Sequence, residues 1–318
     1  MKILHYALGF PPYRSGGLTK MCIDLMVQQA KEGHQVAMLW PGRMGYIKKL
    51  VFVRKRGHTV LKDQKLQSFE IVNPLPVPFD EGITAFEAFT INAGRKAYEA
   101  FLEEISPDVI HFHTLMGLHK NLLEMAKAKG IKLVFTAHDF FPICSKVTMF
   151  RQGRMCSHVE DCTECAACNV TALNLNKIRI LQSPVYRLLK DTAIIKKLRK
   201  QHRDTYLSGS ATGNPSQAIE MAEAYKKLRN YYYSLLKRMD VIHYNSTVTK
   251  EVYESAFELP DNYVIGITHG DIADKRREKN FSDKKIHIRY LGAQGEGKGF
   301  FFLRRHLMNY GVNRIIFA

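Results

Sequence analysis

The stretch KILHYALGFPPYRSGG at residues 2–17 joins an apolar run to a loop rich in proline and glycine. The run from Lys2 to Leu8 is typical of a buried strand, and the amphipathic stretch after the loop, at 18–33, has the spacing of a helix. A second apolar run, HQVAMLW, occupies residues 34–40. A strand, a helix and a strand in this order predict a βαβ unit with parallel strands.

The same alternation continues along the chain. Apolar runs predict further strands at 69–73, 108–113, 131–138, 240–245 and 263–270. Amphipathic stretches predict helices at 83–105, 118–130 and 246–257. We therefore expect an α/β fold built on a doubly wound parallel sheet.

Two segments interrupt this alternation. Residues 142–239 are interpreted as an insertion, first rich in cysteine and then in basic helices, within an N-terminal domain at 1–270. The charged stretch 271–285 predicts a linker. Residues 286–318 supply one strand, one helix and one strand, too little to bury a core alone. We expect them to begin a second Rossmann-like domain that is truncated.

The charge balance indicates the kind of partner. The 318 residues carry 47 Lys and Arg against 30 Asp and Glu, a net charge of +17, which attracts nucleic acid, anionic lipid or a phosphorylated substrate. No apolar run is long enough to span a membrane, and no cleavage site follows the opening run. We expect a cytoplasmic protein that can lie peripherally on the inner face of a membrane.

The loop before the first helix has the features of a phosphate site. It should lie at the carboxyl edge of the sheet, where open α/β folds bind ligands. Gly16 and Gly17 would let the backbone approach a ligand, and the helix after them presents free N–H groups. The alternative is that the two glycines only turn the chain. The pattern G-x-G-x-x-G is absent, so nothing here indicates a nicotinamide or flavin cofactor.

Six motifs in order give a family resemblance. They are FPPYRSGG (10–17), EGHQVAMLWPG (32–42), DVIHFHTL (108–115), TAHD (136–139), VIHYNS (241–246) and YLGAQGEGKGF (290–300). Together they resemble the family 4 glycosyltransferases, which have the GT-B fold. The resemblance implies transfer, with retention of configuration, from a nucleotide-diphosphate sugar to a glycan or lipid-linked acceptor. It also suggests a role in bacterial surface polysaccharide synthesis, without a catalytic cofactor.

The resemblance assigns roles to individual residues. Gly16, Gly17 and Lys298 would bind the donor phosphates, and His138, followed by Asp139, would lie beside the reacting sugar as a hydrogen-bond donor to its hydroxyls. A fixed cation and oriented N–H groups stabilise a departing diphosphate. The alternatives are a solvated turn lysine at Lys298 and a strand-end histidine at His138 whose hydrogen bonds are all made within the protein.

Two departures from the family pattern bear on activity. Ala293 stands where many members have a phosphate-binding arginine, and no E-x7-E pair follows Lys298. We therefore expect the chain to be poorly active or inactive unless another polypeptide completes its donor domain. The alternative function is a non-catalytic sugar- or lipid-binding partner subunit.

The cysteines predict a structural metal. Five of the six lie within 25 residues, at Cys144, Cys156, Cys162, Cys165 and Cys168. Thiolates at this spacing suit structural Zn²⁺, and His158 is a further possible ligand. An iron–sulfur cluster comes second, and unligated thiols or redox pairs are the other interpretation.

The stretch 177–203 carries nine basic residues, one acidic residue and an interleaved apolar set. This composition is typical of a helix on an anionic membrane surface, and equally of a helix that packs on its own domain. Nucleic-acid binding ranks last, because Tyr186 is the only aromatic residue in the stretch.

Overall fold

The computed structural model describes residues 1–11, 14–45, 50–78, 81–94, 96–151, 154–156, 162–169, 172–198, 201, 215–268, 272–274, 276–277, 288, 290, 292 and 298–309. They form two compact units, one from residues 1–149 and 158–271, the other from residues 150–157 and 272–318.

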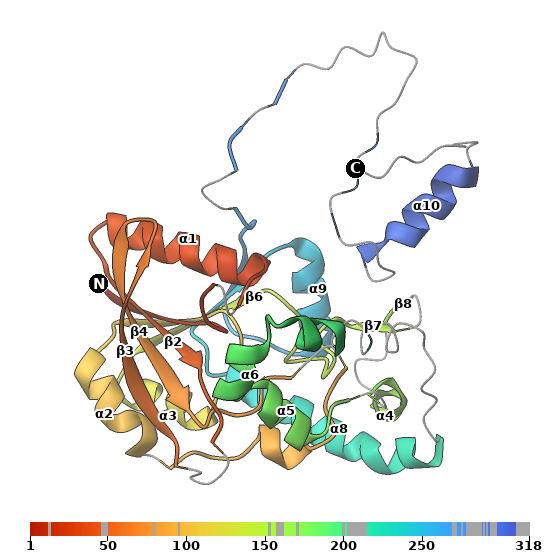
Figure 1. Cartoon of the computed structure of the whole chain (residues 1–318), viewed down its shortest axis with the longest axis horizontal. Coiled ribbons are helices and arrows are strands. Elements are labelled where there is room, and N and C mark those ends of the chain that lie inside the picture. Colours follow the sequence, from red (N-terminus) through yellow and green to blue (C-terminus); the bar gives the residue numbers. More distant parts are fainter. Residues whose placement is uncertain are drawn as a thin grey trace. The chain divides into compact units, whose positions relative to one another are not determined.

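An eight-stranded sheet forms the centre of the first unit (Figure 1). Its strands are β1 (Lys2–Tyr6), β2 (Gln35–Pro41), β3 (Phe52–Leu61), β4 (Gln64–Val72), β5 (Val109–Phe112), β6 (Lys132–Ala137), β9 (Val241–Tyr244) and β10 (Asn262–Val264). Their order across the sheet is β10-β9-β6-β5-β1-β2-β4-β3. All neighbours are parallel except β3 and β4, which form an antiparallel hairpin.

The strand order reverses at the pair β1 and β5. The chain first builds outward from β1 through β2 to the hairpin, then returns to β5 and builds outward the other way through β6 and β9. This confirms the predicted doubly wound α/β sheet. Where such a sheet changes direction, the loops at the carboxyl ends of the strands separate and leave room for a ligand.

Helices cover both faces of this sheet. They include α1 (Gly17–Lys31), η1 (Phe86–Phe89), α2 (Lys96–Ile105), α3 (Lys120–Ala128), α4 (Thr163–Cys168), α5 (Leu175–Leu181), α6 (Pro184–Leu189), α8 (Pro215–Leu236) and α9 (Thr247–Ala256). Figure 1 shows α1 on one side of the sheet and α2 and α3 on the other. None of the described helices is both long enough and apolar enough to cross a membrane.

Each face has its own apolar layer. On one face, Cys22 and Met26 of α1 pack with Met38 of β2. On the other, the ring of Phe101 in α2 meets Phe69 of β4 edge to face, with 5.2 Å between the ring centroids. Because both faces are covered, the central strands are nearly continuous apolar runs, which explains why they stand out in the sequence.

Four expectations of secondary structure need correction. The predicted strand 263–270 is the short β10, which ends at Val264. The predicted strand 69–73 is the end of the longer β4, and its hairpin partner β3 was not predicted. The predicted helix 83–105 is instead η1 and α2, separated by a non-helical stretch around Gly94. The basic stretch is not one helix either, because Ser183 caps a new helix, α6, at Pro184.

The second unit contains a two-stranded ribbon and a helix. The ribbon pairs β7 (Phe150–Arg151) with β8 (Arg154–Met155), and the helix is α10 (Phe300–Asn309), where the sequence predicted one. The expected linker at 271–285 and the expected strands at either end of 286–318 fall largely outside the described residues. The second Rossmann-like domain stays a prediction.

Candidate functional site

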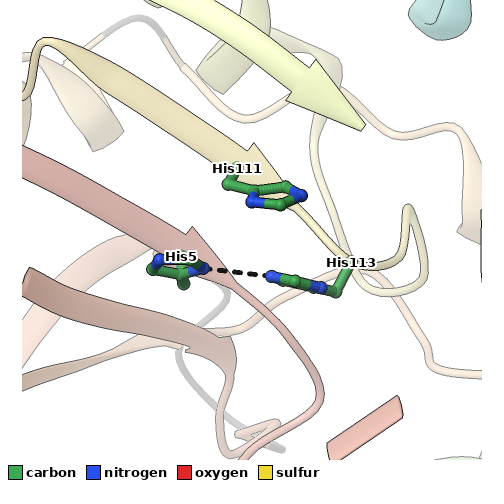
Figure 2. A group of neighbouring side chains, drawn as sticks. All are labelled: His5, His111 and His113. Atoms are coloured by element: carbon green, nitrogen blue, oxygen red, sulfur yellow. Dashed lines mark hydrogen bonds between the residues drawn. The ribbon is translucent and has the colours of Figure 1, made fainter. Parts of the chain in front are cut away.

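Five histidines gather at the carboxyl edge of the sheet, around the point where the strand order reverses. His5 lies on β1, His111 on β5 and His243 on β9, while His113 and His138 directly follow β5 and β6. His5 pairs with His111 in the strand register, and Figure 2 shows both close to His113. Sequence reasoning selected only His138 from this group.

A repeated pattern could have revealed the others. The three-residue pattern of an aliphatic residue, histidine and an aromatic residue occurs at 4–6, 110–112 and 242–244. In parallel strands of one sheet, equal positions before the strand end lie at equal depth. The repetition therefore predicts a row of histidines, once the strand order is known.

Hydrogen bonds connect three of these histidines to helix α1. Gln29 Oε1 lies 2.7 Å from His5 Nε2, and His5 Nδ1 lies 3.0 Å from His113 Nε2. His113 Nδ1 in turn lies 3.2 Å from His138 Nε2. We call Gln29, His5, His113 and His138 the histidine chain.

One amide oxygen sets the direction of every bond in the histidine chain. Gln29 Oε1 can only accept, so His5 Nε2 carries the proton and His5 Nδ1 accepts. For neutral rings, His113 Nε2 must then donate to His5, and His138 Nε2 must donate to His113. His138 Nδ1 is left as a hydrogen-bond acceptor, which differs from the donor role expected from the sequence.

Burial keeps these imidazoles neutral. It lowers the pKa of His5 and of His138 to about 4 in each case. The pKa values of His111 and His113 are also well below the usual range, first because of burial and then because of repulsion from neighbouring imidazoles. At neutral pH the cluster is therefore uncharged.

A metal is the alternative explanation for this cluster, because His5, His111 and His113 each bring one nitrogen within 4.8 Å of the others. The ring geometry argues against it. The rings of His111 and His113 are stacked, with centroids 4.2 Å apart and planes at 28°. Lone pairs lie in the ring planes, so two stacked rings cannot both point at one ion. In addition, His111 Nε2 is hydrogen-bonded to Thr136 Oγ1 at 2.7 Å.

Asp139 shapes the chain after β6. Its Oδ1 accepts a hydrogen bond from the backbone N–H of Phe141 at 3.0 Å, and its backbone carbonyl accepts one from the Tyr253 hydroxyl at 2.8 Å. Burial raises the pKa of the Asp139 carboxyl to about 6. These contacts position the loop that carries His138, and a role beside a sugar stays a prediction.

Gly16 and Gly17 lie at the start of α1, at the same edge of the sheet. Gly16 has φ 117°, a conformation that favours glycine, and no side chain caps the helix. A Cβ at either position would meet no other atom within 4 Å. The open space at both glycines and the uncapped start of α1 are compatible with the approach of a phosphate.

Lys298 belongs to the second unit, whereas Gly16 and His138 belong to the first. It lies two residues before α10, and its backbone carbonyl accepts a hydrogen bond from the Tyr290 hydroxyl at 2.9 Å. Its predicted contact with donor phosphates stays a prediction.

The cysteines are also divided between the two units. Cys144, Cys162, Cys165 and Cys168 lie in the first unit, and Cys156 lies in the second. A hydrogen bond with Cys162, followed by burial, raises the pKa of Cys165. Arg229 of α8 holds this region, because its Nε donates to the Ile143 carbonyl at 3.0 Å and its Nη2 lies 4.0 Å from Cys165 Sγ. The structural zinc stays a prediction.

Comparison with known proteins places part of the chain in a family. Residues 15–158 match the model of Glycosyltransferase Family 4, and this segment contains Gly16, Gly17, His113, His138 and Asp139. No curated protein matches the chain.

Two solved structures show a weak likeness. One is the catalytic domain of starch synthase IV from Arabidopsis thaliana bound to ADP and acarbose, with 14% identity, a TM-score of 0.28, and coverage of 83% of this chain and 74% of that one. The other is an E. coli structure described as trehalose-6-phosphate bound with UDP-2-fluoro glucose, with 10% identity, a TM-score of 0.32, and coverage of 84% and 49%. These TM-scores are too low to support a conclusion about this chain. Residues 15–158, a little under half of the chain, are therefore similar to glycosyltransferase family 4.

Proposed function

We propose that this protein transfers a sugar from a nucleotide-diphosphate sugar to a glycan or lipid-linked acceptor, with retention of configuration at the anomeric carbon. The observation that carries the proposal is the position of His138. It lies within the segment matched by the family and beside the reversal point of the sheet, and it ends the histidine chain. The biological context that we propose is bacterial surface polysaccharide synthesis.

The chemistry needs stabilisation of two charges. When the bond from the sugar to the diphosphate breaks, negative charge develops on phosphate oxygens and positive charge on the sugar ring. The N–H groups that begin α1 at Gly17 are suited to the first charge, and we propose that Lys298 adds a cation.

A neutral His138 is compatible with the positive charge that develops on the sugar ring. An imidazolium would repel the positive charge that develops on the sugar, whereas a neutral imidazole does not. Because Nε2 of His138 is committed to His113, we propose that Nδ1 accepts a hydrogen bond from a sugar hydroxyl. In this role the histidine orients the sugar and does not transfer a proton.

The stretch 177–203 supports a further part of the proposal, which is attachment to an anionic membrane. Val185, Leu188 and Ile194 are exposed by 64%, 82% and 73% among basic residues. Such a surface would bring the enzyme to a lipid-linked acceptor at the inner face of the membrane.

Calorimetry with a panel of UDP-, GDP- and ADP-sugars tests the function, together with an assay for release of the nucleoside diphosphate. We expect one donor to bind, and we expect it to be consumed when another polypeptide completes the donor domain. The variant His138→Ala should lower turnover by about 100-fold while donor binding changes much less, because the residue acts on the reacting sugar. His58 is exposed on β3, so His58→Ala is the matched control. Absence of binding and turnover with every donor, from folded protein, would contradict the proposal.

A further inference from the structure

A cavity of about 450 Å³ opens in the first unit at the carboxyl ends of β1 and β2. Its walls come from the loop after β1, the end of β2, the β3–β4 hairpin and the helices α5 and α6 of the insertion. Figure 1 shows α5 and α6 beside the end of β2. Its volume lies within the range of small-molecule sites.

The lining of the cavity includes three cationic side chains. Arg14, Arg56 and Lys190 line it, and none of the described residues that line it is acidic. On the hairpin that forms one wall, the carboxylate of Glu70 is 2% exposed and is shared by two arginines. It forms an ion pair with Arg54 and a longer one, of 3.9 Å, with Arg56. One carboxylate cannot balance two guanidinium groups, so the hairpin wall keeps a net positive charge.

Aromatic rings form another part of the wall. Trp40 and Tyr186 both line the cavity and are both half-buried. Phe10 packs against Trp40 edge to face, with 5.4 Å between the ring centroids and 73° between the planes, which holds the indole in place. A fixed, partly open aromatic ring offers an apolar surface to the C–H face of a sugar ring.

Gln182 adds a polar group that lacks a partner. Its Nε2 donates to the Val77 carbonyl at 2.8 Å, which fixes the amide plane. Its Oε1 is buried and has no hydrogen-bond partner among the described residues. A buried acceptor without a donor is costly, and a ligand hydroxyl would remove that cost.

We propose that this cavity binds a sugar that carries a phosphate group. The cations match the phosphate, the aromatic rings match the sugar ring, and Gln182 Oε1 matches a sugar hydroxyl. This inference rests on the proposed function, in which the ligand is the acceptor. The ligand has two possible sources, a soluble sugar phosphate and the sugar phosphate headgroup of a lipid.

The chain provides its own probe, because Trp40 is its single tryptophan. The experiment titrates the protein, without any donor, with the 1-phosphates and 6-phosphates of glucose, mannose, galactose and N-acetylglucosamine. Intrinsic fluorescence is followed. We expect saturable changes with at least one sugar phosphate, about 10-fold tighter than with the same free sugar or with inorganic phosphate. The affinity should fall as salt rises.

Variants locate the binding site. Lys190→Gln and Arg56→Gln should each weaken the binding by about 10-fold, since a charge-assisted hydrogen bond is lost. Lys196→Gln is the matched control, because Lys196 is an exposed lysine of the same insertion that does not line the cavity. Circular dichroism confirms that each variant is folded. If Lys196→Gln weakens binding as much as Lys190→Gln, the site is not the cavity.

Vesicles separate the two sources of the ligand. One set carries a polyprenyl-diphosphate-linked sugar, and the other carries the polyprenyl phosphate without sugar. Tighter binding to the first set than to any soluble sugar phosphate identifies the lipid headgroup, and the reverse order identifies the soluble ligand. No change in Trp40 fluorescence with any of these ligands would overturn the inference. Because no donor is present, that result would leave the donor-binding test of the proposed function unaffected.

Discussion

The histidine chain and the cavity lie at the same edge of one sheet, yet they differ in charge. The imidazoles of His5 and His113 are buried, joined by a hydrogen bond and neutral. The cavity is lined by cations, and Gln182 Oε1 has no hydrogen-bond partner in the part of the chain that the structure describes. Under the function and the ligand that we propose, the two parts of the edge have different tasks: one accommodates positive charge on a reacting sugar, and the other binds an anion.

Acid should produce the largest loss of stability, and it should act through the neutral histidine chain. The pKa of His5 is about 4 in the folded protein and about 6.5 unfolded, so between these values only the unfolded chain binds the proton. The stability that this group contributes is therefore present above pH 6.5 and lost as pH falls toward 4. The loss amounts to roughly 3 kcal/mol for His5 alone, and His138 acts in the same direction.

Urea unfolding followed by circular dichroism at several pH values between about 8 and 4.5 measures this effect. Protonation of Asp139, whose pKa is raised to about 6, acts in the opposite direction and offsets a part of the loss. A free energy of unfolding that stays constant from pH 7 to pH 4.5 would show that the histidines are not neutral and buried.

Removing the carboxylate of Glu70 tests the charge of the cavity. In Glu70→Gln, Arg54 loses its buried ionic partner, and we expect the free energy of unfolding to fall by about 3 kcal/mol. The cavity becomes more positive at the same time, so a sugar phosphate should bind more tightly to the folded variant. Glu99→Gln, an acidic position in the first turn of α2, is the control. Weaker binding by Glu70→Gln than by the wild type would contradict the charge assignment.

Gln29 controls the direction of the histidine chain, which gives a smaller and more specific prediction. Gln29→Leu removes the acceptor of His5 Nε2, so the free energy of unfolding should fall by about 1–2 kcal/mol. ¹⁵N NMR of the imidazoles should show His138 as the Nε2–H tautomer in the wild type and as a mixture of tautomers in Gln29→Leu.

The neighbouring Gln28 offers a matched control, because it lies on the same helix and its Nε2 donates to the exposed Glu32. Gln28→Leu should leave the NMR tautomer pattern unchanged. If both variants alter the His138 signals equally, the hydrogen bonds do not transmit the orientation.

The smallest expected effect concerns Asp139. In Asp139→Asn, the acceptor for the Phe141 N–H is retained while the buried charge is removed, so stability at about pH 8 should rise by roughly 1 kcal/mol. Asp139→Ala should lower it, because the N–H loses its partner. Thermal unfolding of the two variants distinguishes the contributions, and a loss of equal size in both would mean that the charge is not destabilising.

Much of the central sheet could be predicted from residue patterns. The segments around β1, α1 and β2 have clear periods because both sheet faces are covered. The hairpin strand β3 was missed because it is half-exposed and basic, with no apolar period, and its turn at Lys62 and Asp63 contains neither proline nor glycine. The prediction of one helix at 83–105 was wrong, because the helical spacing of apolar residues continues through the break near Gly94 that separates η1 from α2.

Only a part of the candidate site could be predicted from the sequence. His138 was recognised through its motif, but its hydrogen-bond partner His113 follows β5 and is bonded in turn to His5 of β1. The direction of these bonds depends on Gln29. The cavity was not predictable, since it joins Phe10, Trp40 and Tyr186 across some 180 residues of chain.

The sequence by itself determined the α/β class, the order of most strands and helices along the chain, and the family motifs, because these depend on local periodicity and on residues that are near one another. Only the tertiary structure decided which strand lies beside which, and therefore which histidines share protons and which cations share a cavity. The physical reason is that hydrogen bonds and ion pairs act over a few ångströms in space, whatever the distance along the chain.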